Sequence, residues 1–166
     1  MDIRIRAARP TEFPETGDLT ASAYLDDGLL GAGAEDPYLL VLRDTPARAG
    51  KADLLVAVDT DDTLLGTVTY AAQGSPLQDI GRPGEAEFRM LAVAHRARGR
   101  GVGEALVREC VARARAERGV VRLVMSTQPA MLGAHRIYER LGFTRTPERD
   151  WEPVPGLSLL TYKMTL

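Results

Sequence analysis

The stretch HRARGRGVGEAL, residues 95–106, places three glycines among basic residues directly before a helical pattern. Glycine allows positive φ angles and lets the backbone approach a ligand closely, and successive amides in such a turn form an anion-binding concavity. A helix that begins after these glycines adds unsatisfied amides and a partial positive charge. The stretch therefore predicts a pyrophosphate-binding site, with a basic turn that binds no ligand as the alternative.

Two other phosphate-binding motifs fit this stretch less well. The glycines at positions 99, 101 and 103 lack the later third glycine of G-x-G-x-x-G, and no repeated parallel strand-helix-strand units surround them. No Gly-Lys-Ser or Gly-Lys-Thr follows, which excludes a Walker loop.

Length and composition indicate an ordinary globular chain. The 166 residues suit one compact core, so we expect a single domain over residues 1–166. No apolar run is long enough to cross a bilayer, and the N-terminus lacks the pattern of an export signal. The single cysteine, Cys110, lies in an apolar helical stripe and has no partner for an internal disulfide. We therefore expect a cytoplasmic protein with Cys110 in the core.

The net charge of −2 hides an asymmetry between the two halves of the chain. Residues 1–87 carry 7 basic and 16 acidic side chains, net −9, whereas residues 88–166 carry 14 and 7, net +7. Such a distribution either steers an anionic and a cationic ligand to different halves or forms two solvated faces. A sequence pI near 5.7 argues against nucleic-acid binding.

Hydrophobic periodicity and turn residues predict the order βααβββαβαββ. Strands are predicted at residues 3–8, 53–58, 63–72, 85–93, 121–127, 143–147 and 157–166. Helices are predicted from Thr11 toward Tyr24, from Asp36 and Pro37 through residue 44, from Val102 to Gly119, and from Pro129 to Gly142. Residues 25–36 and 73–84 form loops. This order predicts an α/β (α+β) fold, a mixed sheet with helices on both faces.

Three segments carry a family resemblance. Residues 98–103, RGRGVG, resemble the R-x-x-G-x-G signature of the GNAT superfamily of acyl-CoA-dependent N-acyltransferases. EFRMLAV before it is similar to that family's fourth strand, and AHRIYERLGF after it is similar to the closing helix and the following Gly-Phe. The motifs span residues 85–143 in the family's order. The resemblance implies a mostly antiparallel sheet of about seven strands, with splayed central strands that bind CoA.

The resemblance also implies acetyl-CoA as co-substrate. We expect no metal, because His95 and His135 lack neighbours at metal-ligand spacing. Amides of residues 98–103 would wrap the pyrophosphate, and Leu91 and Val93 would pair with the pantetheine arm. An amide of Leu91 or Ala92 would stabilise the developing oxyanion. The implied donor-binding residues are Leu91, Ala92, Val93, Arg96, Arg98, Gly99, Arg100, Gly101, Val102 and Gly103. Many relatives have an asparagine where this chain has Met131. The side chain at this position is therefore not expected to make the polar contact to pantetheine that an asparagine would make.

Two residues match catalytic positions of the family. An amine with a pKa of about 10.4 needs a proton acceptor at neutral pH. Glu87 matches a glutamate that serves as base in some relatives, with a salt bridge to Arg89 as the alternative role. Tyr138 matches the tyrosine that lies near the sulfur and donates a hydrogen bond to the leaving thiolate, with a core position as the alternative.

The predicted function is transfer of an acetyl group from acetyl-CoA to a primary amine by direct attack in a ternary complex. The acceptor is a small-molecule or peptide amine, and we expect no nucleic acid and no membrane as partner; a homodimer stays open. The acidic N-terminal half favours a cationic acceptor, bound by the loops at 25–36 and 73–84. The alternatives are a non-catalytic acyl-CoA sensor or interaction module, and a nucleotide-binding module stabilised by ATP or NAD.

Overall fold

The strands at the centre of the molecule are apolar on both faces, which requires helices on both sides of the sheet. The structure, a computed structural model, describes residues 2–166. Its strands are β1 (Arg4–Ala7), β2 (Asp53–Val58), β3 (Leu64–Ala71), β4 (Glu85–Val93), β5 (Arg122–Thr127), β6 (Thr144–Arg145), β7 (Trp151–Val154) and β8 (Leu157–Thr165). Every residue of β3 is buried.

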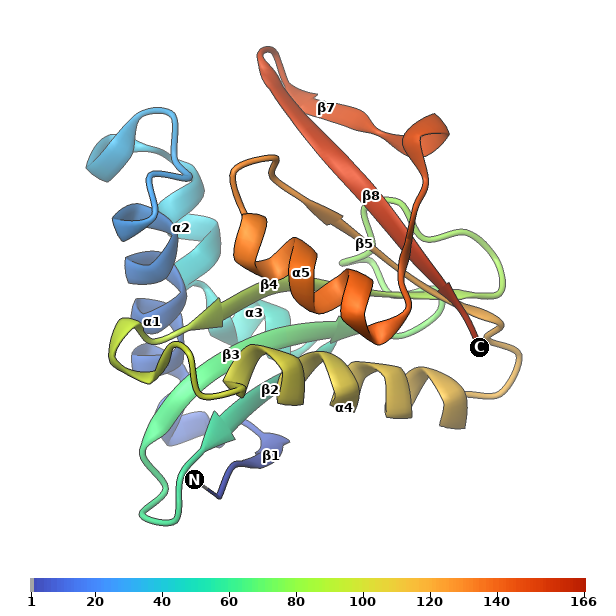
Figure 1. The fold of residues 1–166 in the computed structure, drawn as a ribbon. Coiled ribbons are helices and arrows are strands. Elements are labelled where there is room, and N and C mark those ends of the chain that lie inside the picture. Colours follow the sequence, from blue (N-terminus) through green and yellow to red (C-terminus); the bar gives the residue numbers. More distant parts are fainter. Residues whose placement is uncertain (1) are drawn as a thin grey trace.

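The strands form one mixed sheet in the order β1-β2-β3-β4-β5-β8-β6, with β7 paired to β8 beside this path (Figure 1). Within residues 2–166, β4 and β5 are the only parallel pair. The predicted mixed, mostly antiparallel sheet is therefore confirmed, with eight strands. A single parallel pair does not provide the repeated parallel units of a dinucleotide-binding fold.

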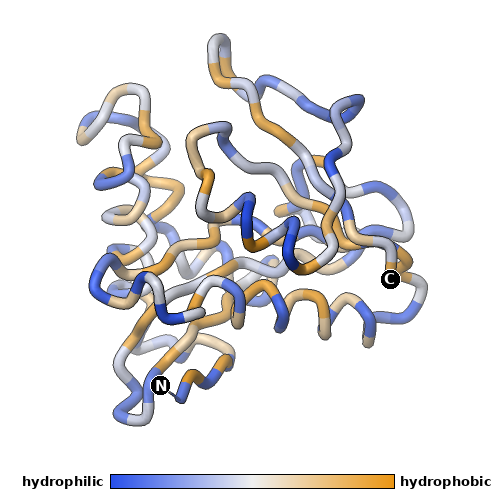
Figure 2. The backbone as a smooth tube through the Cα atoms, in the orientation of Figure 1, coloured by the Kyte–Doolittle hydropathy of each residue, from blue (hydrophilic) through white to orange (hydrophobic). Residues whose placement is uncertain are grey.

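Helices cover the two faces of the sheet unequally. One face carries α1 (Phe13–Asp26), α2 (Tyr38–Arg43) and α3 (Thr45–Ala49), and the other carries α4 (Val102–Ala116) and α5 (Leu132–Leu141) (Figure 1). The largest buried cluster lies under α4 and α5 and includes Cys110, which is fully buried as expected. A smaller cluster joins α1 and α2 to Met90 of β4. Figure 2 shows hydrophobic residues concentrated along the central strands.

Three predicted helix boundaries are wrong by one to three residues. Thr11 lies in a 3₁₀ turn, Pro10–Glu12, because Pro10 opens that turn and the Glu12 carboxylate accepts the Arg9 amide at 2.9 Å. The α1 helix begins only after Glu12. Residues 129–131 form a turn, so α5 begins after residue 131, whose ψ of 57° is not helical. The α4 helix ends before the turn in which Gly119 takes a φ of 85°.

The predicted cap of α2 is close to the observed one. The Asp36 carboxylate accepts the Tyr38 amide at 2.9 Å, although the helix starts one residue later than expected. The short helix α3 and the strand β7 were not predicted, because neither is long enough to show a period. Among residues 2–166, no helix is long and apolar enough to cross a membrane.

Candidate active site

The central strands β4 and β5 separate after three residue pairs. Their parallel pairing covers Glu85 to Glu87 of β4, after which β5 continues beside β8 and β4 beside β3. A β-bulge leaves Val68 opposite two β4 residues, Met90 and Leu91, and Met90 has a φ of 55°. The remaining edge of β4 therefore faces a gap instead of a neighbouring strand.

A cavity of about 700 Å³ occupies this gap. It is lined by Leu91, Ala92 and Val93 of β4, by the loop before α4, by the first turns of α5 and by the end of α1. Ligand cavities in proteins usually measure about 300–1,000 Å³. The volume and the open strand edge together suit an elongated ligand that lies along β4.

The loop before α4 has the conformation that the glycines predict. Gly99 and Gly101 have φ values of 75° and 82°, and α4 begins directly after Gly101. Within residues 2–166, the amides of Gly101, Val102 and Gly103 donate to no backbone carbonyl. A Cβ on Gly103 would lie 3.2 Å from Ile137 Cδ1, so this glycine allows α4 and α5 to pack closely. The loop thus presents open donors at one end of the cavity.

The predicted donor-binding residues divide into two groups. Eight of them line the cavity: Leu91, Ala92, Val93, Arg98, Gly99, Gly101, Val102 and Gly103. Arg96 and Arg100 are not part of this lining. The guanidinium of Arg96 donates to the Leu64 carbonyl at 2.8 Å, so it is directed toward the β2–β3 turn.

The end of α1 closes the cavity from the opposite side. Asp27 accepts two hydrogen bonds from Arg98, each 2.8 Å long, and the Gln128 side chain donates to the Leu29 carbonyl at 3.0 Å. Asp27 and Leu29 line the cavity together with Tyr24. Residues 25–36 were expected to bind the acceptor; in the structure Asp27 instead contacts the loop before α4.

Glu87 is fully buried and binds the loop at residues 73–84. Its Oε1 accepts the amides of Asp79, Ile80 and Gly81 at 3.0, 2.9 and 2.9 Å. Its Oε2 has no hydrogen-bond partner among residues 2–166. Burial raises the pKa of Glu87 despite these three amides. The alternative salt bridge to Arg89 is not formed, because Arg89 pairs with Asp79 at 3.0 Å.

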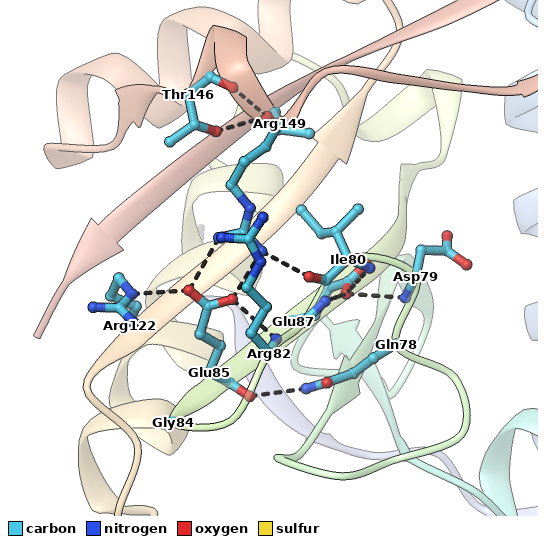
Figure 3. Close-up of polar contacts among 12 residues, drawn as sticks. Gln78, Asp79, Ile80, Arg82, Gly84, Glu85, Glu87, Arg122, Thr146 and Arg149 are labelled. Atoms are coloured by element: carbon cyan, nitrogen blue, oxygen red, sulfur yellow. Dashed lines mark hydrogen bonds and ion pairs between the residues drawn. The ribbon is translucent and has the colours of Figure 1, made fainter.

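A buried ion pair supports the same loop (Figure 3). The Glu85 carboxylate binds Arg149 at 2.9 Å and Arg122 at 2.8 Å, and it accepts the Arg82 amide at 3.0 Å. Arg149 also donates to the Ile80 carbonyl at 2.7 Å. Burial opposes ionisation, but the hydrogen bonds from Arg149 and Arg122 hold the pKa of Glu85 below its usual value.

Removing the Glu85 charge should destabilise the protein. Glu85→Gln leaves the largely buried Arg149 without its counterion, and breaking a buried pair costs about 3–5 kcal/mol. Urea unfolding measures this loss, with Glu109→Gln as a control that removes the half-exposed pair with Arg113 and costs less than about 1 kcal/mol. The pKa of Glu85 is lowered in the folded protein. The contribution of its charge to the free energy of unfolding is therefore present at neutral pH and is lost as the pH falls through the folded-state pKa. Equal losses in the two variants would contradict this assignment.

Tyr138 lies in an aromatic cluster instead of the cavity lining. Its ring centroid is 5.9 Å from those of Phe88 and Phe143 and 5.7 Å from that of Tyr162. The Tyr138 hydroxyl makes no hydrogen bond within the described residues. Burial raises its pKa, so the phenol stays protonated at any working pH.

Met131 occupies the cavity wall at the start of α5. Its sulfur accepts a hydrogen bond from Thr127 Oγ1 at 3.6 Å, and its side chain is otherwise apolar. This wall therefore offers an apolar contact to a ligand.

Comparisons with known proteins agree with this geometry. The profile of the acetyltransferase (GNAT) family matches residues 19–143. The chain therefore belongs to the GNAT acetyltransferase family. An uncharacterized N-acetyltransferase of Schizosaccharomyces pombe is 30% identical over 112 residues, 68% of this chain. The chain spans 64% of the length of this curated relative.

Solved structures share the fold over nearly the whole chain. A GCN5-related N-acetyltransferase from Kribbella flavida is 25% identical with a TM-score of 0.71, covering 99% of this chain and 98% of its own. A putative acetyltransferase from Salmonella typhimurium, solved with its cofactor acetyl-CoA, has 18% identity and a TM-score of 0.71, covering 100% of this chain and 95% of its own.

Proposed function

We propose that the protein is an N-acetyltransferase that moves an acetyl group from acetyl-CoA to a primary amine by direct attack in a ternary complex. The observation that carries this proposal is the cavity along the open edge of β4, between β4 and the start of α5, which ends at the open amides of the loop before α4. Family membership and the acetyl-CoA named with one solved neighbour support the choice of donor.

The donor would bind mainly through the backbone. The amides before and at the start of α4 would hold the pyrophosphate, while the unpaired edge of β4 at Leu91 and Val93 would pair with the pantetheine arm. Arg98 lies at this end, where Asp27 orients its guanidinium and offsets its charge, so the amides would supply most of the binding. An amide of Leu91 or Ala92 would stabilise the carbonyl oxygen as it becomes negative.

In the reaction, the amine nitrogen attacks the thioester carbonyl, the C–N bond forms and the C–S bond breaks. The proton leaves the amine for the Glu87 carboxylate through a water molecule, since Glu87 is fully buried and does not line the cavity. The raised pKa of Glu87 makes it a stronger base than an exposed glutamate. The released thiolate takes its proton from solvent, because the raised pKa of Tyr138 disfavours full proton transfer. Tyr138 lies outside the cavity lining, so the hydrogen bond that it would donate to the thiolate requires its hydroxyl to turn toward the ligand.

The acceptor is proposed to be a small-molecule or peptide amine, and the reaction to occur in the cytoplasm. The decisive experiment is thiol release from acetyl-CoA across a panel of amines. Release with at least one amine supports the enzyme, whereas CoA binding without release across a broad panel supports the non-catalytic sensor. Stabilisation by ATP or NAD but not by CoA would contradict both.

Tyr138→Phe should lower kcat by about tenfold or more, since a hydrogen bond to a charged group contributes about 1.5–3 kcal/mol. Phenylalanine keeps the ring in the aromatic cluster and removes only the hydroxyl, so the melting temperature should change little. Steady-state kinetics measure the effect. The control is Tyr162→Phe, which removes a neighbouring hydroxyl that makes only a 3.5 Å contact with Glu139. Equal kcat values in these two variants and the wild type would remove Tyr138 from the mechanism.

A further inference from the structure

Arg48, in α3, is a buried cation with unused hydrogen-bond donors. The residue is 3% exposed, and its Nη1 donates to the Val41 carbonyl at 2.7 Å. Its Nε and Nη2 have no acceptor within residues 2–166. The nearby carboxylate of Asp44 is exposed. It accepts a hydrogen bond from the Ala47 amide at 3.3 Å and makes no hydrogen bond with Arg48. A buried charge without a direct partner is costly, so this arrangement suits an anionic ligand.

Arg48 belongs to a cluster that also contains Tyr24, Tyr38 and Arg89, here called the Arg48 cluster. Arg48 is linked to this group through α2, because it donates to the Val41 carbonyl of the helix that begins with Tyr38. The rings of Tyr24 and Tyr38 lie 6.4 Å apart, and Arg89 Nη2 donates to the Tyr38 hydroxyl at 3.4 Å. The cluster therefore joins α1, α2, α3 and β4 at one place.

The two arginines of the cluster differ in their partners. Arg89 uses all three nitrogens: Nε pairs with Asp79 at 3.0 Å, Nη1 donates to the Leu77 carbonyl at 3.0 Å, and Nη2 binds Tyr38. Asp79 thus offsets the charge of Arg89, whereas Arg48 has no carboxylate in direct contact within the part of the chain that the structure describes. Of the two arginines, only Arg48 has nitrogens without an acceptor among residues 2–166.

The Arg48 cluster lies next to both parts of the proposed reaction site. Tyr24 lines the donor cavity. Glu87 and Arg89 lie two residues apart on β4, so their side chains lie on the same face of the strand. Asp79 connects them directly, because its amide donates to Glu87 at 3.0 Å while its carboxylate pairs with Arg89.

We propose that Arg48 binds a carboxylate of the acetyl acceptor, which makes the acceptor an amine that also carries a carboxylate, as a free amino acid does. The inference rests on the proposed function. Nε and Nη2 are adjacent donors that match a carboxylate in bidentate geometry. Arg48 is 3% exposed and does not line the cavity, so binding requires the neighbouring side chains to move before a carboxylate reaches Nε and Nη2.

The test compares matched amines with and without a carboxylate. L-leucine with 3-methylbutylamine and L-phenylalanine with 2-phenylethylamine are assayed by thiol release from acetyl-CoA. The ratio of kcat/KM within each pair is then compared between wild type and Arg48→Met, so that differences in amine basicity cancel. We expect Arg48→Met to lower the ratio by about 10- to 100-fold, the size of a hydrogen bond to a charged group, with the rate for the plain amine within about threefold.

The control is Arg43→Met, which removes an exposed arginine that pairs only loosely with Asp18 at 3.7 Å and should leave the ratio unchanged. The melting temperature of Arg48→Met should not fall, because the variant removes an unpaired buried charge. If it does fall, Arg48→Lys is assayed in the same way. A carboxylate ratio that is the same in wild type and variant, or an equal loss for both amines, overturns the proposal.

A binding measurement separates this inference from the proposed function. In the presence of CoA, L-leucine or L-phenylalanine at millimolar concentration should raise the melting temperature of the wild type but not of Arg48→Met. If wild type binds acetyl-CoA and releases no thiol with any amine, the proposed function fails, and this binding measurement still decides whether Arg48 receives a carboxylate. Equal shifts in both proteins, or none in either, contradict the carboxylate site.

Discussion

Gly101→Val is expected to lower the affinity for acetyl-CoA by about 100-fold or more. A β-branched residue rarely adopts the φ of 82° found at Gly101, so valine moves the backbone toward negative φ. The amides at the start of α4 then no longer converge on one anion. Each hydrogen bond to a charged group contributes about 1.5–3 kcal/mol, so loss of one or two accounts for the expected effect. Isothermal titration with acetyl-CoA measures it.

A matched control separates binding from backbone strain. Gly156 lies in the turn between β7 and β8 with a φ of 85°, and a Cβ there, as at Gly101, would meet nothing within 4 Å. Gly156→Val imposes the same conformational penalty away from the cavity lining, so it should lower stability and leave CoA affinity unchanged. The phosphate-binding role of the loop is wrong if the two variants bind acetyl-CoA equally well.

Glu87→Gln should lower kcat by about 100-fold or more, the usual range for loss of a general base being 10²–10⁴. The amide oxygen of glutamine can still accept the amides of Asp79, Ile80 and Gly81, so the loop and the KM for acetyl-CoA should be preserved. Because burial raises the pKa of Glu87, the kcat of the wild type should fall on the acid side around a pKa above 4.5. This acid limb should be absent in the variant.

Glu117→Gln is the control for this experiment. Its carboxylate accepts the Tyr70 hydroxyl and the Gln73 amide, each at 2.8 Å, and thus holds the other end of the same loop. The substitution removes a charge near the loop without touching the proposed base. Full activity of Glu87→Gln at every pH, or equal losses in the two variants, would show that Glu87 only supports the loop.

The sequence predicts well those elements that depend on the conformational preferences of neighbouring residues. Alternating glycines before an apolar helical stripe predicted the loop and the helix α4, because positive φ and periodicity are properties of short segments. Boundaries near prolines were less accurate, since Pro10 and Pro129 initiate turns as readily as they begin helices.

The partners of charged residues depended on the tertiary structure. Glu85 and Glu87 are two residues apart on β4, and the sequence does not distinguish them. Glu85 binds two arginines, of which Arg149 is 64 residues away. Glu87 accepts three amides of the loop at residues 73–84. Likewise, Arg89 pairs with Asp79 instead of the neighbouring Glu87.

The sequence by itself determined the family, the sheet with its covering helices and the donor loop, because these follow from short-range conformational preference and from motifs in order along the chain. Only the tertiary structure brought Asp27 to Arg98, 71 residues apart, and placed Arg48 among side chains of α1, α2 and β4. Long-range pairing depends on how the faces of the sheet and helices pack, and no local pattern encodes which charges meet there. The donor is therefore encoded in one short loop, whereas the proposed acceptor site exists only after the chain has folded.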